Sequence, residues 1–267
     1  MRILVMTDIE GVTGVTTFPQ AESSAFGRDM LMHDLLAVIE GIKAAGQHEI
    51  VLYDMHTDGR NIDLSALDES VSVVVGKPLS REKWKSLDGP FDGLFLLGLH
   101  AMAETPGALM AHTYLREYKA VYINGKRVGE IAIEAALAAE QAVPLLFVSG
   151  DSCGCAEAVS QFPDIQAVVV KESLGDAEAL CYPPAQTRQR LFAGAKAAAA
   201  QTRKAVCQAP DQPVTIAIEF SQCHYLEVLR RLHPEIFVNQ DRVELTGPTL
   251  FACWTRYLEY EREMIKG

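Results

Sequence analysis

Residues 2–14 read "RILVMTDIEGVTG", and this stretch decides the fold that the sequence predicts. The run from Ile3 to Met6 is short, continuous and apolar, as is typical of a strand buried on both faces of a parallel sheet. The strand ends at two carboxylates, Asp8 and Glu10, in a loop that contains two glycines. Three interpretations fit such a loop: a solvated turn, the nucleophile loop of a phosphatase, or the first ligands of a metal site.

Strand and helix patterns alternate along the rest of the chain. Apolar residues repeat at helical spacing from Leu31 to Ile42, and Gly46 is expected to end that helix. Asn124-Gly125 predicts a hairpin with a type I′ turn. Further strands are expected at residues 49–54, 93–98, 144–150, 167–172 and 214–220, and further helices at 130–142, 184–206 and 250–266.

This alternation predicts an α/β fold, with a mainly parallel sheet flanked by helices and right-handed crossovers. We expect two domains. A catalytic, metal-binding α/β domain would span residues 1–165, and a smaller C-terminal α/β domain would span residues 166–267.

The composition of the chain limits the kinds of molecule that it is expected to bind. The chain of 267 residues is 49% hydrophobic and 22% charged, as expected of a soluble globular protein, and its formal net charge is -11. Because no basic stripe is present to neutralise phosphates, a nucleic-acid partner is not expected. The apolar runs are too short to span a membrane, and no secretory signal is visible, so we expect a cytoplasmic protein.

The six cysteines are scattered, which indicates reduced thiols rather than a disulfide scaffold. Cys153-Gly-Cys155 has no second pair with metal-ligand spacing. We therefore interpret this pair as small, buried residues at the start of a helix.

Five residues of metal-ligand type follow successive β segments. In open α/β sheets, ligands bind beyond the carboxyl ends of the strands, so these residues are expected to gather at one edge. Each also has a structural interpretation, such as a turn acid, a hydrogen-bonded loop histidine or a first-turn helix glutamate. The five candidates are Asp8, Glu10, His56, His100 and Glu130.

Two histidines and three carboxylates suit Zn²⁺ or Mn²⁺ rather than Ca²⁺, which prefers oxygen ligands throughout. Five ligands also exceed the three that one catalytic zinc keeps. A carboxylate that bridges two metal ions is the economical arrangement, and Asp8, nearest the strand end, is our choice for the bridge. Asp54 is a candidate to orient an imidazole or to hold the strand end. Lys171 is expected to be a solvated strand-end lysine, with contact to a peptide carboxylate as the alternative.

Ordered motifs across nearly the whole chain resemble the zinc-dependent D-aminopeptidases of the DppA type, and the match is densest up to about residue 175. They are "DIEGVTG", "DMHTDGRN", "LLGLHAMAETPGALMAHT", "YINGKRVGEIAIEA" and "VPLLFVSGD". The resemblance implies a metallopeptidase with two zinc ions per subunit, held by Asp8, Glu10, His56, His100 and Glu130. It also implies that His112 is an additional catalytic histidine.

The family resemblance further implies short peptides or amino-acid amides as substrates, a preference for residues of D configuration, and a homo-oligomer, a decamer of two stacked pentameric rings. Two alternatives stay open. The Asp-x-Glu-Gly start resembles the Asp-x-Asp start of Mg²⁺-dependent haloacid-dehalogenase-type phosphohydrolases, although the later acidic pair of that family is not evident. A metal- or peptide-binding assembly protein without turnover is the non-enzymatic alternative.

Overall fold

The computed structural model describes residues 1–76, 90–201 and 208–266, which form two sheets with seven α-helices among these residues. The larger sheet has parallel pairings throughout, except that β9 is antiparallel to β8. Its strands, in spatial order, are β3 (Val71–Val74), β2 (Glu49–Asp54), β1 (Arg2–Thr7), β4 (Gly93–Leu99), β7 (Leu145–Asp151), β8 (Gln166–Gly175) and β9 (Glu178–Cys181). The predicted α/β class and its mainly parallel sheet are confirmed.

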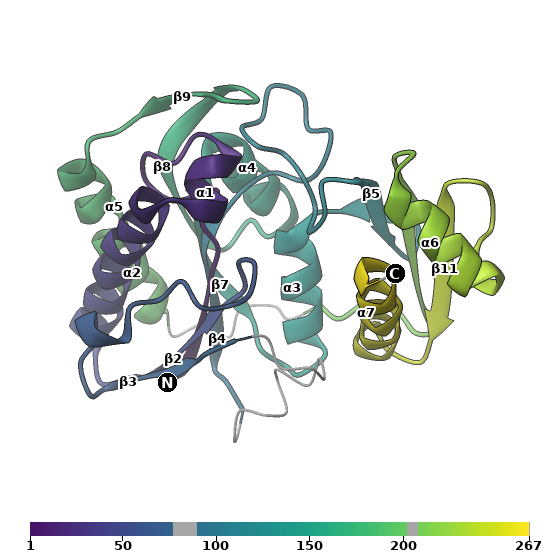
Figure 1. The fold of residues 1–267 in the computed structure, drawn as a ribbon. Coiled ribbons are helices and arrows are strands. Elements are labelled where there is room, and N and C mark those ends of the chain that lie inside the picture. Colours follow the sequence, from purple (N-terminus) through teal and green to yellow (C-terminus); the bar gives the residue numbers. More distant parts are fainter. Residues whose placement is uncertain (77–89, 202–207, 267) are drawn as a thin grey trace.

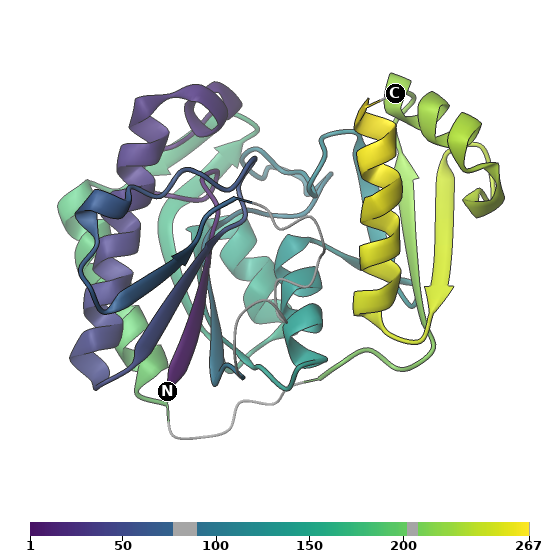
Figure 2. The same cartoon turned by 60° about the horizontal axis from the view of Figure 1, so that its bottom comes forward.

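Helices cover both faces of the larger sheet (Figures 1 and 2). Side chains alternate across each strand, so Ile3 and Val5 of β1 pack with α2 (Ala25–Ala45) and α5 (Pro184–Ala199). Leu4 and Met6 pack on the opposite face, with α3 (Glu130–Ala139) and α4 (Ser152–Gln161). Burial on both faces explains why β1 is a continuous apolar run.

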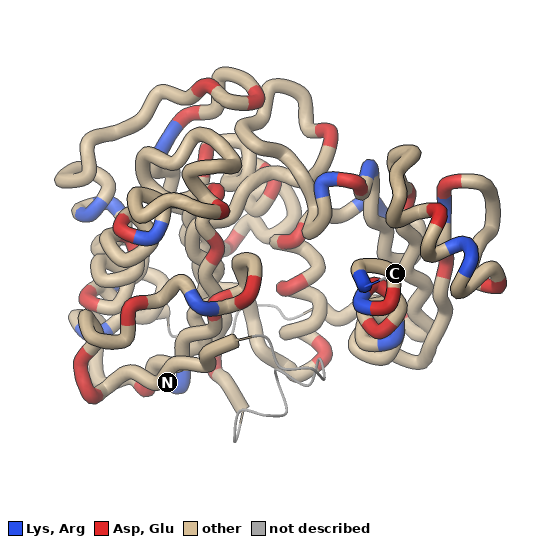
Figure 3. The backbone as a smooth tube through the Cα atoms, viewed as in Figure 1, with Lys and Arg blue, Asp and Glu red and all other residues tan. Residues whose placement is uncertain are grey.

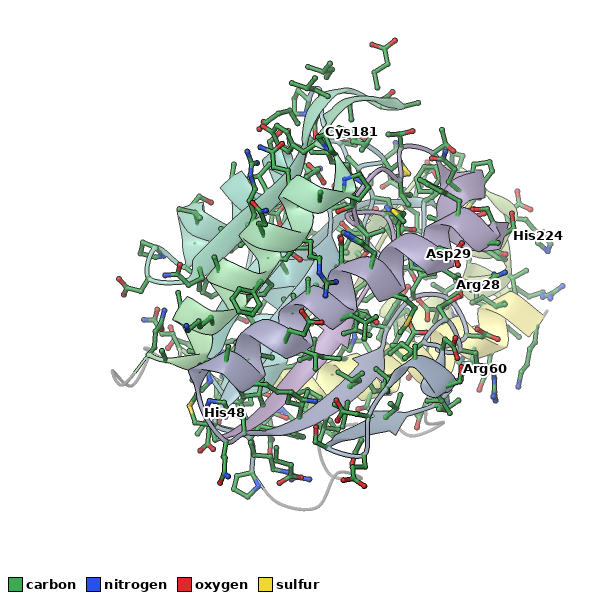
Figure 4. The ribbon with its side chains drawn as sticks, turned by 90° about the vertical axis from the view of Figure 1, so that its left-hand side faces the viewer. Arg28, Asp29, His48, Arg60, Cys181 and His224 are labelled. Atoms are coloured by element: carbon green, nitrogen blue, oxygen red, sulfur yellow. The ribbon has the colours of Figure 1, made fainter. Side chains whose placement is uncertain are left out.

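The helix α2 follows the predicted pattern. Leu31, Leu35, Val38 and Ile42 are buried, and Gly46 caps the helix with φ +152°, a backbone angle that favours glycine. The helices α2 and α5 run side by side in Figure 4, which labels Arg28 and Asp29 on α2 and His48 just beyond its far end.

The smaller sheet is antiparallel and carries α7 (Leu250–Lys266) and α6 (His224–Leu232), whereas α1 (Phe18–Ser23) precedes α2 beside the larger sheet. The predicted type I′ hairpin is confirmed, because Asn124 and Gly125 have φ angles of +49° and +77°. The strand order is β11 (Arg242–Gly247), β10 (Val214–Phe220), β5 (Tyr118–Ile123) and β6 (Lys126–Val128). Apolar residues of α3 reach both cores, so this helix joins the two sheets.

The predicted boundary at residue 165 does not coincide with this division into sheets. Residues 166–199 supply β8, β9 and α5 to the larger sheet, whereas β5 and β6 enter the smaller sheet before residue 165. The long-range pairing of β5 with β10 decides this membership, and local patterns do not encode it.

Two helices are shorter than their patterns indicated. The helix predicted over residues 130–142 ends at Ala139, and Ala142 turns away with φ +59°. The helix predicted over 184–206 ends at Ala199, and residues 202–206 of that prediction lie outside the described residues.

Charged residues of both signs are interspersed along the described chain in the view of Figure 3, without a basic stripe on that face. Among the described helices, none is both long and apolar enough to cross a membrane.

Candidate metal centre

Parallel pairing brings the ends of three strands of the larger sheet together. Thr7 of β1 pairs with Asp54 of β2 on one side and with Leu97 of β4 on the other. The residues that follow these strands therefore meet at one edge. The residues predicted to gather at this edge lie there, and all five are buried: Asp8, Glu10, His56, His100 and Glu130.

Glycines let the loop after β1 approach the end of β4 closely. A Cβ atom on Gly11 would lie 1.9 Å from the carbonyl oxygen of Leu99. Gly98 has φ +77°, and a Cβ there would lie 2.3 Å from the carbonyl oxygen of Asp8.

The carboxylate of Asp8 lies between two imidazoles. Its Oδ1 is 2.9 Å from Nδ1 of His56, which is also 3.1 Å from Oε2 of Glu10. Its Oδ2 is 3.5 Å from Nε2 of His100, which is also 3.4 Å from Oε1 of Glu130. Asp8 thus directs one oxygen to each of two groups, and each group contains its own imidazole and its own further carboxylate.

These spacings fit metal coordination. Two ligand atoms at about 2.0–2.1 Å from a tetrahedral zinc ion lie about 3.3 Å apart, close to the four separations above. Within the described residues, Oε2 of Glu10 and Nε2 of His100 are buried polar atoms without a hydrogen-bond partner. Because such atoms are costly to bury, a cation bound to each of the two groups accounts for them.

Hydrogen bonding fixes the tautomer of His100. Its Nδ1 lies 3.0 Å from the carbonyl oxygen of Ala101, which can only accept a hydrogen bond. Nδ1 is therefore protonated, and in the neutral ring Nε2 directs its lone pair at Asp8 and Glu130. A carbonyl that orients a histidine in this way is typical of metal sites.

In the metal-free cluster, electrostatic interactions favour the charged forms of the carboxylates and the imidazoles. Burial alone would raise the pKa of Asp8, but the close approach of His100 and His56 outweighs it and holds this pKa well below its ordinary value. Burial likewise opposes charge on His56, yet its hydrogen bond to Asp8 and its ion pair with Glu10 raise its pKa to about 11. The pKa of His100 is raised well above its ordinary value by Asp8 and Glu130 against the effect of burial. Protons thus occupy the imidazoles where a divalent cation would replace them.

His112 lies against this cluster. Its ring stacks on that of His100, with centroids 4.1 Å apart and an interplanar angle of 7°. Nδ1 of His112 donates to the carbonyl oxygen of Met110 over 2.8 Å, so Nε2 is the acceptor nitrogen of the neutral ring. Burial, together with the charge on His100, lowers the pKa of His112. A neutral imidazole beside the centre is suited to accept a proton.

The cluster opens into a cavity of about 640 Å³ between the larger sheet and α7. Its wall includes Asp8, Glu10, His56, His112 and Glu130 together with residues of α7. This volume is in the range of small-molecule sites.

The structure bears on two secondary predictions, those for Asp54 and Lys171. Asp54 holds the strand end, the second of its two predicted roles. Its Oδ1 accepts from the backbone N–H of His56 at 3.1 Å, and its Oδ2 accepts from the backbone and side chain of Asn61. Lys171 is neither solvated nor in contact with the cavity, because it is fully buried and donates to backbone carbonyls of the loop after β1.

Tyr114 and Glu134 belong to the cavity wall but were not predicted. The backbone N–H of Tyr114 donates to Oε1 of Glu130 at 2.7 Å, and its hydroxyl donates to Oε1 of Glu134 at 2.9 Å. Glu134 is buried one helical turn after Glu130 in an otherwise apolar helix, and that placement was an available signal. Tyr114 gave no comparable signal, because its backbone amide makes the contact with Glu130.

The cysteine predictions are in part confirmed. The five described cysteines, Cys153, Cys155, Cys181, Cys223 and Cys253, are free thiols. Cys155 is buried in α4, as expected of a small residue near a helix start, whereas Cys153 is only partly buried.

An open α/β sheet that gathers carboxylates and imidazoles at its carboxyl edge, beside a cavity, is typical of a metal-dependent enzyme. Comparison with known proteins identifies the family of this enzyme. The model of peptidase family M55, described as D-aminopeptidase, matches residues 1–257, and the chain belongs to this family.

A D-aminopeptidase of Bacillus subtilis (strain 168) is 30% identical over 229 residues, which cover 83% of this chain and 82% of that relative. The fold matches a solved structure described as the Zn-dependent D-aminopeptidase DppA from Bacillus subtilis, a self-compartmentalizing protease. That match has a TM-score of 0.91 at 24% identity and covers 100% of this chain and 99% of the other.

Proposed function

We propose that the protein is an aminopeptidase with a dinuclear zinc centre that releases N-terminal residues of D configuration from short peptides or amino-acid amides. The observation that carries the proposal is the position of Asp8, whose two oxygens face two separate imidazole–carboxylate groups. His56 and Glu10 would complete one zinc site, and His100 and Glu130 the other. When bound, the zinc ions activate water and polarise the scissile carbonyl.

The protein's own residues supply orientation and proton transfer. Ala101 fixes the ring of His100, and the backbone N–H of Tyr114 fixes the carboxylate of Glu130. His112 is proposed as the group that accepts a proton at Nε2 and returns it to the leaving amine, or that donates to the developing oxyanion once protonated. The α7 side of the cavity, with Leu258 and Ile265, offers apolar surface to the substrate side chain.

A phosphatase mechanism is not supported by this geometry. The two imidazoles that face Asp8 would have no role if its carboxylate were the nucleophile, and the chain belongs to a peptidase family.

We also propose that the protein works as a homo-oligomer in the cytoplasm, with a decamer as the specific expectation. The solved relative is described as self-compartmentalizing. Here, Leu174 and Leu180, on the hairpin that forms one edge of the larger sheet, are 65% and 57% exposed, which suits contact with another subunit. The free thiols suit a reducing compartment. Light scattering that gives the mass of a single chain would contradict the assembly.

The experiment that tests the activity is a panel of D- and L-aminoacyl amides and dipeptides, assayed beside metal quantification of the same preparation. We expect about two zinc ions per chain, chelator-sensitive hydrolysis and faster turnover of D substrates. Full zinc occupancy without hydrolysis would favour the binding protein, and hydrolysis unaffected by chelators would exclude the zinc mechanism.

A further inference from the structure

Lys171 is the buried cation that the proposed chemistry does not use. It lies on β8, its side chain is 0% exposed, and it is among the largest fully buried side chains of the described chain. Its ammonium group donates to three backbone carbonyl oxygens, those of Glu10 at 2.5 Å, Val12 at 2.8 Å and Val15. An ammonium has three donors, so all of them are used on one loop.

The contacts of Lys171 are made with dipoles rather than with a paired carboxylate. No described salt bridge includes Lys171, although Asp151, Asp34 and Glu10 lie near enough to act on it electrostatically. Burying an ammonium costs desolvation free energy, and the hydrogen bonds to three convergent carbonyl oxygens compensate for this cost. Such convergence is how proteins hold monovalent cations, where carbonyl oxygens replace the hydration shell of the ion.

The loop that Lys171 holds is the one that carries the first two candidate ligands. The same loop is fastened at its other positions by Asp34, which accepts from the backbone N–H and hydroxyl of Thr13 at 2.8 and 2.6 Å. Gly11 donates to the carbonyl oxygen of Gly98 at 2.7 Å. Without the ammonium, three carbonyl oxygens of this loop would converge with no donor between them, and Glu10 would lose its fixed position.

From this geometry we infer that Lys171 is a positioning residue that serves as an internal monovalent cation and holds the loop of Asp8 and Glu10 in its zinc-binding conformation. The inference rests on the proposed zinc centre, and it assigns no contact with the substrate. It predicts that removal of the side chain leaves a site for a small external cation with N–H donors.

Chemical rescue of zinc binding tests this role. In Lys171→Ala, zinc affinity is expected to fall by about 10–100-fold, the range seen when groups that support metal ligands are removed. Ethylammonium or ammonium should restore most of it, whereas tetramethylammonium at the same ionic strength should not, because it has no N–H donor. Lys171→Met, which fills the space without charge, should lose affinity and resist rescue. Lys196→Met, at an exposed lysine of α5, is the matched control.

Zinc affinity is read by competition with a chromogenic chelator, without substrate, and therefore separates this inference from the proposed activity. Folded Lys171 variants that bind zinc within twofold of the wild type would overturn the inference, even if the wild type is an active aminopeptidase. A wild type that binds zinc but hydrolyses no panel substrate, with rescue as described, would overturn only the activity. If the variants fold only with added cation, refolding in ethylammonium but not tetramethylammonium supports the inference, and no recovery in either overturns it.

Discussion

Asp54→Asn is expected to loosen the loop of His56 without removing any candidate ligand. The Asp54 carboxylate accepts three hydrogen bonds, from the backbone of His56 at 3.1 Å and from the backbone and side chain of Asn61 at 2.6 and 3.0 Å. An asparagine amide has only one acceptor oxygen, so its NH₂ group would face an N–H donor of either His56 or Asn61, with which it cannot form a hydrogen bond.

The magnitude follows from these contacts. Each hydrogen bond to a charged acceptor contributes about 1.5–3 kcal/mol, and at least one is lost. Burial, partly offset by the bonds from Asn61 and His56, raises the pKa of Asp54, so removing the charge returns some of this loss. The net expectation is a decrease of about 2 kcal/mol in the free energy of unfolding, or roughly 4–8 °C in melting temperature for a chain of this size. Zinc affinity should fall about tenfold.

The assay is calorimetric unfolding of the zinc-free protein, followed by zinc titration. Asp58→Asn is the matched control, because its side chain lies in the same loop and is 71% exposed. A melting temperature within about 1 °C of the wild type, together with unchanged zinc affinity, would refute the reasoning.

Three further substitutions test other parts of the site. His112→Ala is expected to keep its zinc by metal analysis and to lose most of its turnover, and loss of zinc would instead make His112 a ligand. Gly11→Ala should lower the free energy of unfolding by about 2–3 kcal/mol in urea titrations, because its Cβ would lie 1.9 Å from the Leu99 carbonyl oxygen. Gly175→Ala, whose Cβ would meet only Glu178 atoms at 4.0 Å, is its control, and equal midpoints for the two variants would contradict the close approach. Burial raises the pKa of Glu157 to about 7. The hydrogen bond from Met102 and the charge of nearby His100 oppose this rise, whereas the charges of Glu130 and Asp151 add to it. The native state therefore holds a proton that the unfolded chain has released, so this group makes the zinc-free protein lose about 3 kcal/mol of stability as pH rises from about 4.5 to 7. Glu157→Gln should remove that slope from the stability–pH profile, and parallel profiles for the two proteins would count against it.

The candidate site was predictable because its residues follow strands whose ends must meet. Asp8, His56 and His100 come within two residues of the ends of β1, β2 and β4, and parallel pairing leaves them little freedom to lie elsewhere. Their ligand types then limited the chemistry, and the order of the motifs indicated the family that the comparison shows.

Features that depend on long-range contacts were not predictable. Lys171 follows the apolar run of β8 as a strand-end lysine would, and only the folded loop 161 residues earlier in the chain reveals its carbonyl partners. The division into sheets depends on the pairing of β5 with β10, whose paired residues are 93 to 102 positions apart, and neither segment encodes this pairing alone. Backbone donors such as the N–H of Tyr114 carry no residue-type signal at all.

Anomalous diffraction at the zinc edge, from crystals of the zinc-loaded protein, tests the dinuclear centre most directly. Two peaks of similar height per chain are expected, one between Asp8, Glu10 and His56 and the other between Asp8, His100 and Glu130. A single peak, or a pair of peaks that the Asp8 carboxylate does not bridge, would contradict the proposed centre.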